Sequence, residues 1–112
     1  MKTLALIAAT AAIATSMSAS AFAYDRQGRI DIRQDQQAYR IRHDRRTGEL
    51  TVLEKWRLQA EQRRIAGMER TALRDGYISR REANRISAEQ DKASYDIYRL
   101  SHNGRVAWWR LR

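Results

Sequence analysis

Three glycines spaced 28 residues apart constrain the fold of this chain more than any other feature of its sequence. They are Gly48, Gly76 and Gly104. Two residues after each glycine comes an aliphatic side chain, in the order Leu50, Ile78 and Val106. Recurrence at one fixed offset indicates that the same supersecondary unit occurs more than once. We therefore expect each glycine to occupy the same kind of turn.

The residues after the first two glycines predict the starts of two helices. Thr51-x-x-Glu54 and Ser79-x-x-Glu82 match the capping box, in which the hydroxyl accepts the N3 amide and the carboxylate accepts the cap amide. Residues 31–34 have the pattern Asp-x-x-Gln and would open an earlier helix in the same way. The glycines stand where a C′ residue of positive φ ends the preceding helix.

Because the chain contains no proline, nothing interrupts a helix between these signals. The sequence predicts helices at 31–46, 51–74 and 79–102, joined by short glycine turns. Short links between long helices favour antiparallel neighbours. We expect an all-α fold, a three-helix up-down-up antiparallel bundle.

Apolar patterns differ between the second and third helices. The third has one narrow stripe at 3-4 spacing, formed by Ala83, Ile86, Gln90, Ala93, Ile97 and Leu100. The second has two apolar faces, one with Leu58, Ile65, Met68 and Ala72 and the other with Leu53, Trp56, Ala60 and Gly67. A second apolar face is either sandwiched between both neighbours or offered to a partner chain, so homodimerisation stays open.

The topology predicts which residues meet at the ends of the bundle. We expect Leu50 and Val106 to pack together at one end, with a short backbone bridge, and Ile78 to lie near Ile30 and Ile32 at the other. Three glutamines share the 28-residue spacing: Gln34, Gln62 and Gln90. We expect them to form a polar layer that sets the register of the helices, the alternative being that they line a ligand groove.

The first 23 residues match a secretory signal peptide. Lys2 supplies a positive n-region, residues 4–13 an apolar h-region, and residues 21–23, Ala-Phe-Ala, a small-x-small cleavage site. The apolar run is short for a transmembrane helix, the alternative being an uncleaved interfacial anchor. The sequence predicts cleavage before Tyr24 and a periplasmic or secreted protein.

Cleavage would leave 89 residues, with 21 basic and 13 acidic side chains and a net charge of +8, because residues 1–23 contain one lysine and no acid. Exported domains of this size often carry disulfides, but the chain has no cysteine, so its fold must stand without them. We divide the chain into a signal peptide 1–23, an N-terminal extension 24–30, a three-helix domain 31–104 and a tail 105–112.

Nearly all basic side chains of the cleaved chain are arginines, since only Lys55 and Lys92 are lysines. Arginine binds carboxylate and phosphate groups in bidentate fashion, so an anionic partner is expected, although a compositional bias toward arginine would give the same pattern. Bases and acids alternate along residues 61–70, which is typical of a salt-bridged surface. Together with export, this excludes nucleic acid as the expected partner.

The stretch 74–82 resembles the second half of an EF-hand calcium loop. The residues that fit the later loop positions are Asp75, Gly76, Ile78 and Glu82. Thr71 and Leu73 stand where that family has early ligands, and neither supplies a carboxylate. We expect no metal, with Asp75 and Glu82 as the best candidate ligands; a degenerate EF-hand ion-binding regulator remains an alternative.

The sequence also lacks the residue patterns of common catalytic sites. There is no cysteine, no Gly-x-Ser-x-Gly and no His-Glu-x-x-His. His43 and His102 both fall near predicted helix C-termini, where positive charge is favourable. The bundle would allow them a shared metal site, but surface roles are favoured. We expect no enzyme activity and no cofactor.

The tail supplies the candidate partner-binding residues, which are Arg105, Trp108, Trp109, Arg110 and Arg112. Tryptophan and arginine favour a bilayer interface with anionic lipid, so peripheral membrane contact is open, and they also dominate protein binding hot spots. The alternative is that one tryptophan, Trp108, folds back over the open end of the bundle. We expect the two adjacent rings not to be buried together.

Leu50-Thr51 followed by Glu54 resembles the LTxxQ motif of periplasmic envelope-stress chaperones, which are small, basic, all-helical and exported, with Glu in place of Gln. The layout also resembles small exported proteins of Gram-negative bacteria, which implies a location but no activity. The leading prediction is a non-enzymatic envelope protein, a binding or structural module for a protein or anionic surface. The alternative is a chaperone or stress sensor that uses the second apolar face of the middle helix.

Overall fold

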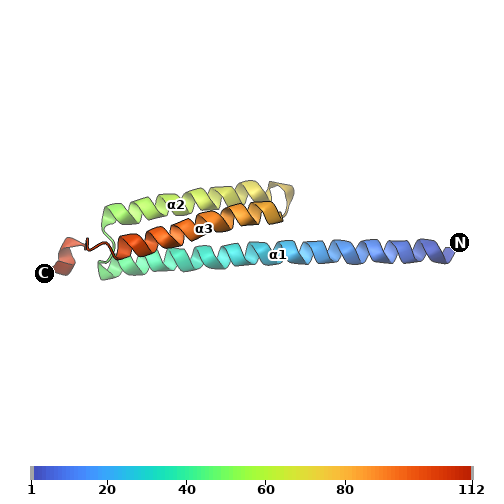
Figure 1. Cartoon of the computed structure of the whole chain (residues 1–112), viewed down its shortest axis with the longest axis horizontal. Helices are drawn as coiled ribbons and strands as arrows, with labels where there is room; N and C mark the ends of the chain where they lie inside the picture. Colours follow the sequence, from blue (N-terminus) through green and yellow to red (C-terminus); the bar gives the residue numbers. More distant parts are fainter. Residues whose placement is uncertain (1, 112) are drawn as a thin grey trace.

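A computed structural model describes the backbone of residues 2–111 and the side chains of residues 21–110. Three helices, α1 (Lys2–Thr47), α2 (Val52–Ala72) and α3 (Arg80–Ser101), pack side by side, with α1 and α3 parallel and α2 antiparallel to both (Figure 1). Short 3-10 helices follow α2 (η1, Leu73–Asp75) and end the described tail (η2, Trp108–Leu111). The predicted all-α, up-down-up bundle is confirmed.

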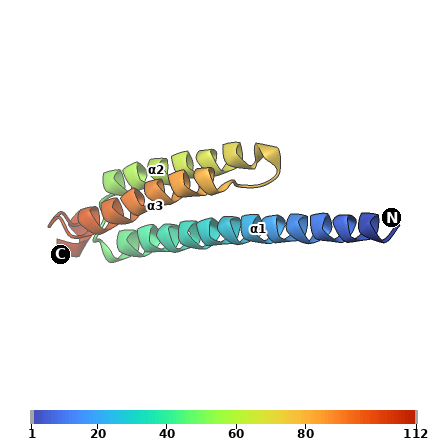
Figure 2. The same ribbon diagram turned by 45° about the vertical axis from the view of Figure 1, so that its right-hand side comes forward.

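Helix α1 is much longer than the sequence predicts and extends well beyond the other two helices (Figure 2). Residues 31–34 lie within it, so the predicted capping box at its start is wrong, and the segment 24–30 is helical and continuous with the bundle. The residues before 31 contain many alanines and no proline, and Gly28 alone costs a helix only about 1 kcal/mol. Cleavage before Tyr24 stays a prediction.

The turns have the local geometry that the repeat predicts. All three repeat glycines have positive φ, 81° at Gly48, 92° at Gly76 and 79° at Gly104. Thr51 and Glu54 form a complete capping box, with the Glu54 amide 3.2 Å from Thr51 Oγ1 and the Thr51 amide 3.1 Å from Glu54 Oε1. At the start of α3 the Glu82 amide donates to Ser79 Oγ at 3.1 Å, as predicted. The predicted second bond of this capping box differs, because the Glu82 carboxylate accepts the Ser79 hydroxyl rather than the Ser79 amide.

Two apolar clusters fill the bundle, one toward each end. The first contains Ile30, Ile65, Ala72, Ile78, Ile86 and Ala93. The second contains Ile41, Leu50, Leu58, Ile97 and Leu100. The predicted proximity of Ile78 and Ile30 is confirmed, but Ile32 is 60% exposed, because two residues turn a helix by roughly 200°.

A glutamine layer lies between the two clusters, and its α1 member is Gln37 rather than the predicted Gln34. Gln62 Nε2 donates to Gln37 Oε1 at 2.9 Å, and Gln37 Nε2 donates to the Gln90 carbonyl at 2.8 Å. Gln37 Nε2 also lies 2.8 Å from Ser94 Oγ, and Gln90 Nε2 donates to the Ile30 carbonyl. The layer joins all three helices through buried Gln37 and Gln90 and partly buried Gln62, whose polar groups bond one another, which favours one register.

Candidate functional site

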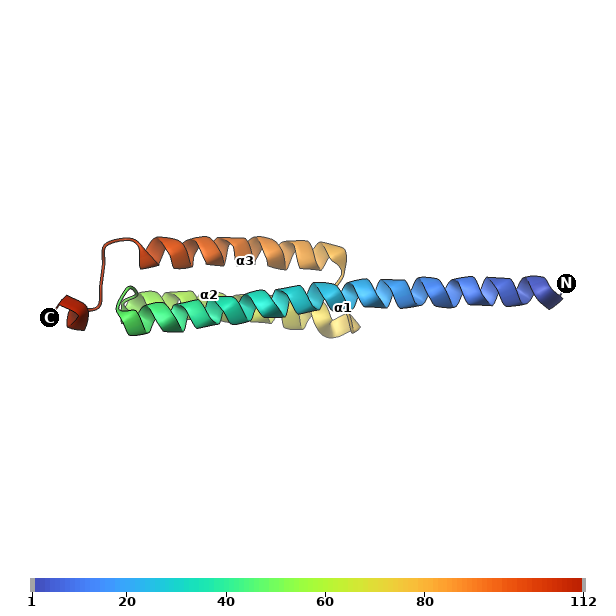
Figure 3. The same ribbon diagram turned by 90° about the horizontal axis from the view of Figure 1, so that it is seen from below.

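The tail folds back across the turn between α1 and α2. Figure 3 shows the chain leaving α3 and crossing toward the end of α1. The Ala107 amide donates to the Gly48 carbonyl at 2.9 Å, beside fully buried Leu50 and partly buried Val106. A backbone bridge therefore joins the two predicted segments, through Gly48 and Ala107 rather than through the expected pair, Leu50 and Val106.

The two tail tryptophans have different environments. The ring of Trp109 lies over Gly48, since a Cβ built on that glycine would be 3.2 Å from Trp109 Cη2. Trp109 is 39% exposed, whereas Trp108 is 68% exposed. The alternative that Trp108 folds back over this end is therefore replaced by a contact of its neighbour, because Trp109 and Arg110 are the residues that cover Gly48. Arg112 lies outside the described residues.

The carboxylate of Asp44 points into the bundle at this end. It is only 5% exposed and accepts hydrogen bonds from Ser101 Oγ at 2.6 Å and from His43 Nδ1 at 3.1 Å. Burial acts to raise the pKa of Asp44, but these hydrogen bonds and the charges of Arg40 and His43 outweigh it and hold the pKa below its usual value. Asp44 is therefore an internally bonded anion at neutral pH.

Glu54 is also bonded within the fold. Its Oε1 accepts the Thr51 amide, and its Oε2 accepts the side-chain amide of Asn103 at 2.7 Å. The carboxylate thus connects the start of α2 with the segment that follows α3. Since Glu54 is 7% exposed, it contributes little negative surface at this end of the molecule.

The basic side chains at the same end face solvent instead. Arg42, Arg46, Arg105 and Arg110 are exposed and Arg45 is partly exposed, and none of the five forms an ion pair with a carboxylate among residues 21–110. We call the surface formed by these five arginines with Trp108 and Trp109 the arginine–tryptophan end. Glu49 is the one partly exposed carboxylate among the described residues of the α1–α2 turn.

The fold adds apolar residues from α2 that the sequence did not connect with the tail. Val52, Leu53 and Trp56 lie in the first turns of α2, at the same end of the bundle, and are 40%, 73% and 58% exposed. The second apolar face of α2 is therefore exposed rather than sandwiched between neighbours. In the sequence, the closeness of these three residues to Gly48 was the available signal. The packing of the tail across the Gly48 turn places the tail beside this part of α2.

Each of the two histidines, His43 and His102, packs against a tyrosine one turn earlier in the chain. His43 stacks on Tyr39 with ring centroids 6.0 Å apart, and His102 stacks on Tyr98 at 4.2 Å and lies 2.7 Å from the Tyr98 carbonyl. Across the described residues, no group of three or more His, Cys, Asp or Glu side chains is placed to hold a metal ion. Asp75 is exposed, and the Glu82 carboxylate accepts the Ser79 hydroxyl.

Two carboxyl groups of α2 face carboxyl groups of the other helices. Glu69 is 8% exposed and faces Asp31 of α1. Burial, followed by a hydrogen bond with Asp31 and its charge, raises the pKa of Glu69 to about 7. Burial and the neighbouring Asp96 of α3 likewise raise the pKa of Glu61. These pairs make the stability of the bundle depend on pH.

Comparisons with protein-family models, with curated proteins and with solved structures give no match for this chain. Within the described part of the chain, no helix has the length and hydropathy needed to cross a bilayer. The geometry of the arginine–tryptophan end therefore carries the functional conclusion.

Proposed function

We propose that this chain is an exported, non-enzymatic binding module that attaches to an anionic component of the cell envelope through the arginine–tryptophan end. One observation carries the proposal. At this end Asp44 and Glu54 are buried and bonded within the fold. The five arginines are exposed or partly exposed, Trp108 is exposed, and Trp109 remains 39% exposed although its ring lies over Gly48. Acidic and basic residues are mixed along the sequence, but at this end the fold buries the two carboxylates and leaves the arginines accessible to solvent.

The residue types match such a partner. Arginine binds phosphate or carboxylate oxygens through paired N–H groups. Tryptophan favours the boundary between headgroups and acyl chains, where an apolar ring and a polar N–H are both satisfied. The hydrogen bond from Ala107 to Gly48 holds the tail in place, so less conformational entropy is lost on binding than for a free tail.

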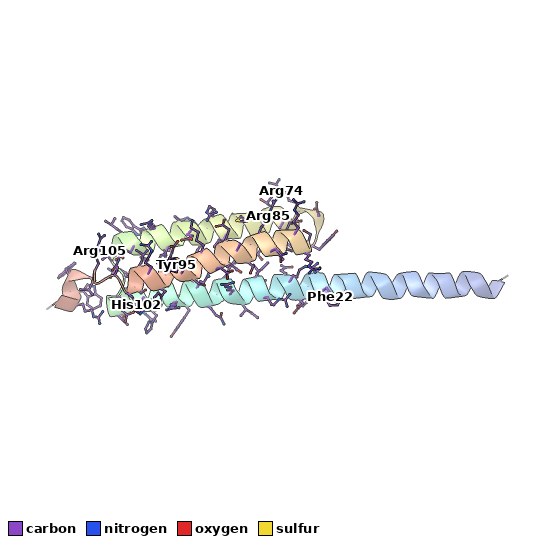
Figure 4. All side chains as sticks on the ribbon, viewed as in Figure 1. Phe22, Arg74, Arg85, Tyr95, His102 and Arg105 are labelled. Carbon is purple, nitrogen blue, oxygen red and sulfur yellow. The ribbon has the colours of Figure 1, made fainter. Side chains whose placement is uncertain are left out.

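Sedimentation with phosphatidylglycerol and phosphatidylcholine vesicles tests the proposal. We expect binding to the anionic vesicles that weakens with salt. Arg105→Gln with Arg110→Gln should weaken it roughly 30-fold, because each arginine near an anionic surface contributes about 1 kcal/mol. Arg74→Gln with Arg85→Gln is the control, since these exposed arginines lie at the other end of the bundle (Figure 4).

Equal losses for the two double variants would mean that only net charge matters and would reject a localised site. Equal binding to neutral and anionic vesicles would reject electrostatic attachment. Point substitutions are preferred to deletion of 105–112, because deletion also removes the Ala107–Gly48 hydrogen bond.

A chaperone is the second candidate function, favoured by the exposed apolar face of α2. Leu53 and Trp56 lie one turn apart on this face. Such exposed side chains suit contact with the apolar segments of an unfolding client. In an assay with a heat-labile client enzyme, the unmodified chain should suppress aggregation of the client, and Leu53→Ser with Trp56→Ser should abolish this suppression. No suppression by the unmodified chain would reject this candidate.

A further inference from the structure

A groove of about 1330 Å³ runs between α1 and α3 near the α2–α3 turn, at the opposite end from the arginine–tryptophan end. Its α1 side includes Ala23, Arg26, Ile30 and Arg33. Its α3 side includes Arg80, Ala83, Ser87 and Gln90. No residue of α2 lines it, so it opens on the side facing away from that helix.

The two sides have matching helical geometry. Both sets of four residues follow a 3-4-3 spacing, which places each set along one face of its helix. Because α1 and α3 are parallel, these faces form two straight walls about 15 Å long. A groove between the first and third helices, away from the second, is where the fourth helix of an up-down-up-down bundle packs.

The floor is suited to close approach of another helix. Ile30 and Gln90 are 4% and 1% exposed and form its buried base. Ala83 and Ser87 are small, which lets a neighbouring backbone come near. The volume exceeds the range of roughly 300–1,000 Å³ that is usual for drug-sized ligands, so a chain segment fits better than a small molecule.

The charge of the walls is positive. Arg26 and Arg80 come from opposite sides and have no carboxylate partner among the described residues; Arg26 Nε donates to the Ile78 carbonyl at 3.0 Å. Arg33 forms an ion pair with a carboxylate of α3. Among the residues with described side chains, Asp75 is the one carboxylate that lines the groove.

We propose that this groove binds an acidic amphipathic helix of a protein partner, which completes a four-helix arrangement. Apolar side chains of that helix cover the floor, and its carboxylates pair with Arg26 and Arg80. A second copy of this chain is a poor occupant, because its net charge, +9 for the whole chain and +8 after cleavage, repels an identical molecule. Cleavage before Tyr24 would remove Phe22 and Ala23 from the end of the α1 wall and place a new ammonium group beside the groove, while Arg26, Ile30 and Arg33 remain.

Fluorescence anisotropy with a designed probe tests the proposal. The protein is purified after export, and its N-terminus is determined by mass spectrometry. The probe is a labelled peptide of about 18 residues, long enough to form a helix, with glutamate on one face and leucine on the other. A control peptide of the same composition has the two residue types intermixed, so it keeps the charge but loses the apolar face.

We expect the amphipathic probe to bind and the intermixed peptide to bind at least about tenfold more weakly. Arg80→Gln should raise the Kd about fivefold through loss of one partly exposed ion pair. Ser87→Tyr fills the floor without changing charge and should abolish binding. Arg85→Gln is the matched control on the same helix, and Figure 4 shows Arg85 on the α2 side of the bundle, so the Kd should stay within about twofold.

Absence of probe binding, or equal effects of Arg80→Gln and Arg85→Gln, overturns the proposal. So does binding of phosphatidylglycerol vesicles with the same dependence on Arg80 and Ser87 in place of the peptide, which would make the groove a lipid site. Circular dichroism melts check that each variant is folded. The double variant of Arg105 and Arg110 should bind the probe normally, so failure of this inference and failure of the proposed function are distinguishable.

Discussion

Substitution of Gly48 by alanine tests how the tail is held. The residue has a φ of 81°, in the left-handed region. A Cβ there would lie 3.0 Å from Arg110 Cβ, 3.1 Å from Arg110 Cδ and 3.2 Å from Trp109 Cη2. The side-chain ends can rotate away, but Arg110 Cβ moves only with the tail backbone. We therefore expect Gly48→Ala to displace the tail.

The expected magnitude follows from the three repeat glycines. A left-handed conformation costs a non-glycine residue roughly 1–2 kcal/mol. Alanine also has less conformational freedom than glycine in the unfolded chain, and this offsets about 0.4–1 kcal/mol of the loss of stability. Gly76→Ala and Gly104→Ala meet no atom within 4 Å, so each should lose about 1 kcal/mol. Gly48→Ala should lose about 2 kcal/mol, because the Ala107 hydrogen bond contributes roughly 1 kcal/mol more.

Urea titration and hydrogen exchange measure these effects. For a domain of this size, 1 kcal/mol also corresponds to a Tm decrease of about 4–8 °C. The Ala107 amide should lose its exchange protection in Gly48→Ala and keep it in Gly76→Ala. Vesicle binding should weaken only in Gly48→Ala, although neither substitution changes charge. Equal stability losses with equal Ala107 exchange in the two variants would refute the packing of the tail on Gly48.

Three further predictions concern the interior. The raised pKa of Glu69 means that its protonated form is favoured in the folded state, so its contribution to stability is complete below pH 4.5 and is lost as pH rises through about 7. The free energy of unfolding, measured in denaturant titrations, should therefore fall by up to about 3 kcal/mol between pH 5 and 9, and Glu69→Gln should remove this fall. An unchanged pH dependence in Glu69→Gln would contradict the prediction. Gln37→Leu leaves the Gln62 side-chain amide without its acceptor and should lower the free energy of unfolding by about 1–3 kcal/mol. The double variant Gln37→Leu with Gln62→Leu should lose less than this single variant, and simple additivity in a double-mutant cycle would argue against the layer. Glu54→Ala should destabilise more than the repeat-equivalent Glu82→Ala by about 1 kcal/mol, since only Glu54 also bonds the segment after α3; equal melting temperatures would show that this bond contributes nothing.

The glutamine layer illustrates where sequence reasoning stops. The 28-residue spacing correctly places Gln62 and Gln90 in it. It selects Gln34 on α1, whereas the fold uses Gln37, one turn further along. Repeat spacing aligns positions within the chain, but the axial shift of α1 against its neighbours decides which side chain reaches the layer.

The long α1 has a related cause. A local Asp-x-x-Gln pattern predicts a helix start at residue 31, but a cap forms only where the preceding backbone leaves the helix. The upstream residues are good helix formers, so the chain continues as a helix through that point.

The sequence alone determined the helix starts at Thr51 and Ser79, the left-handed glycines and the apolar stripe of α3. These features depend on residues within about one or two helical turns of one another, where a side chain meets its own backbone. Only the tertiary structure decided that Asp44 and Glu54 turn inward, that Trp109 rather than Trp108 covers Gly48, and that tail and α1 arginines share one end. Those outcomes depend on which distant groups compete for each carboxylate and ring, and local spacing carries no information about them.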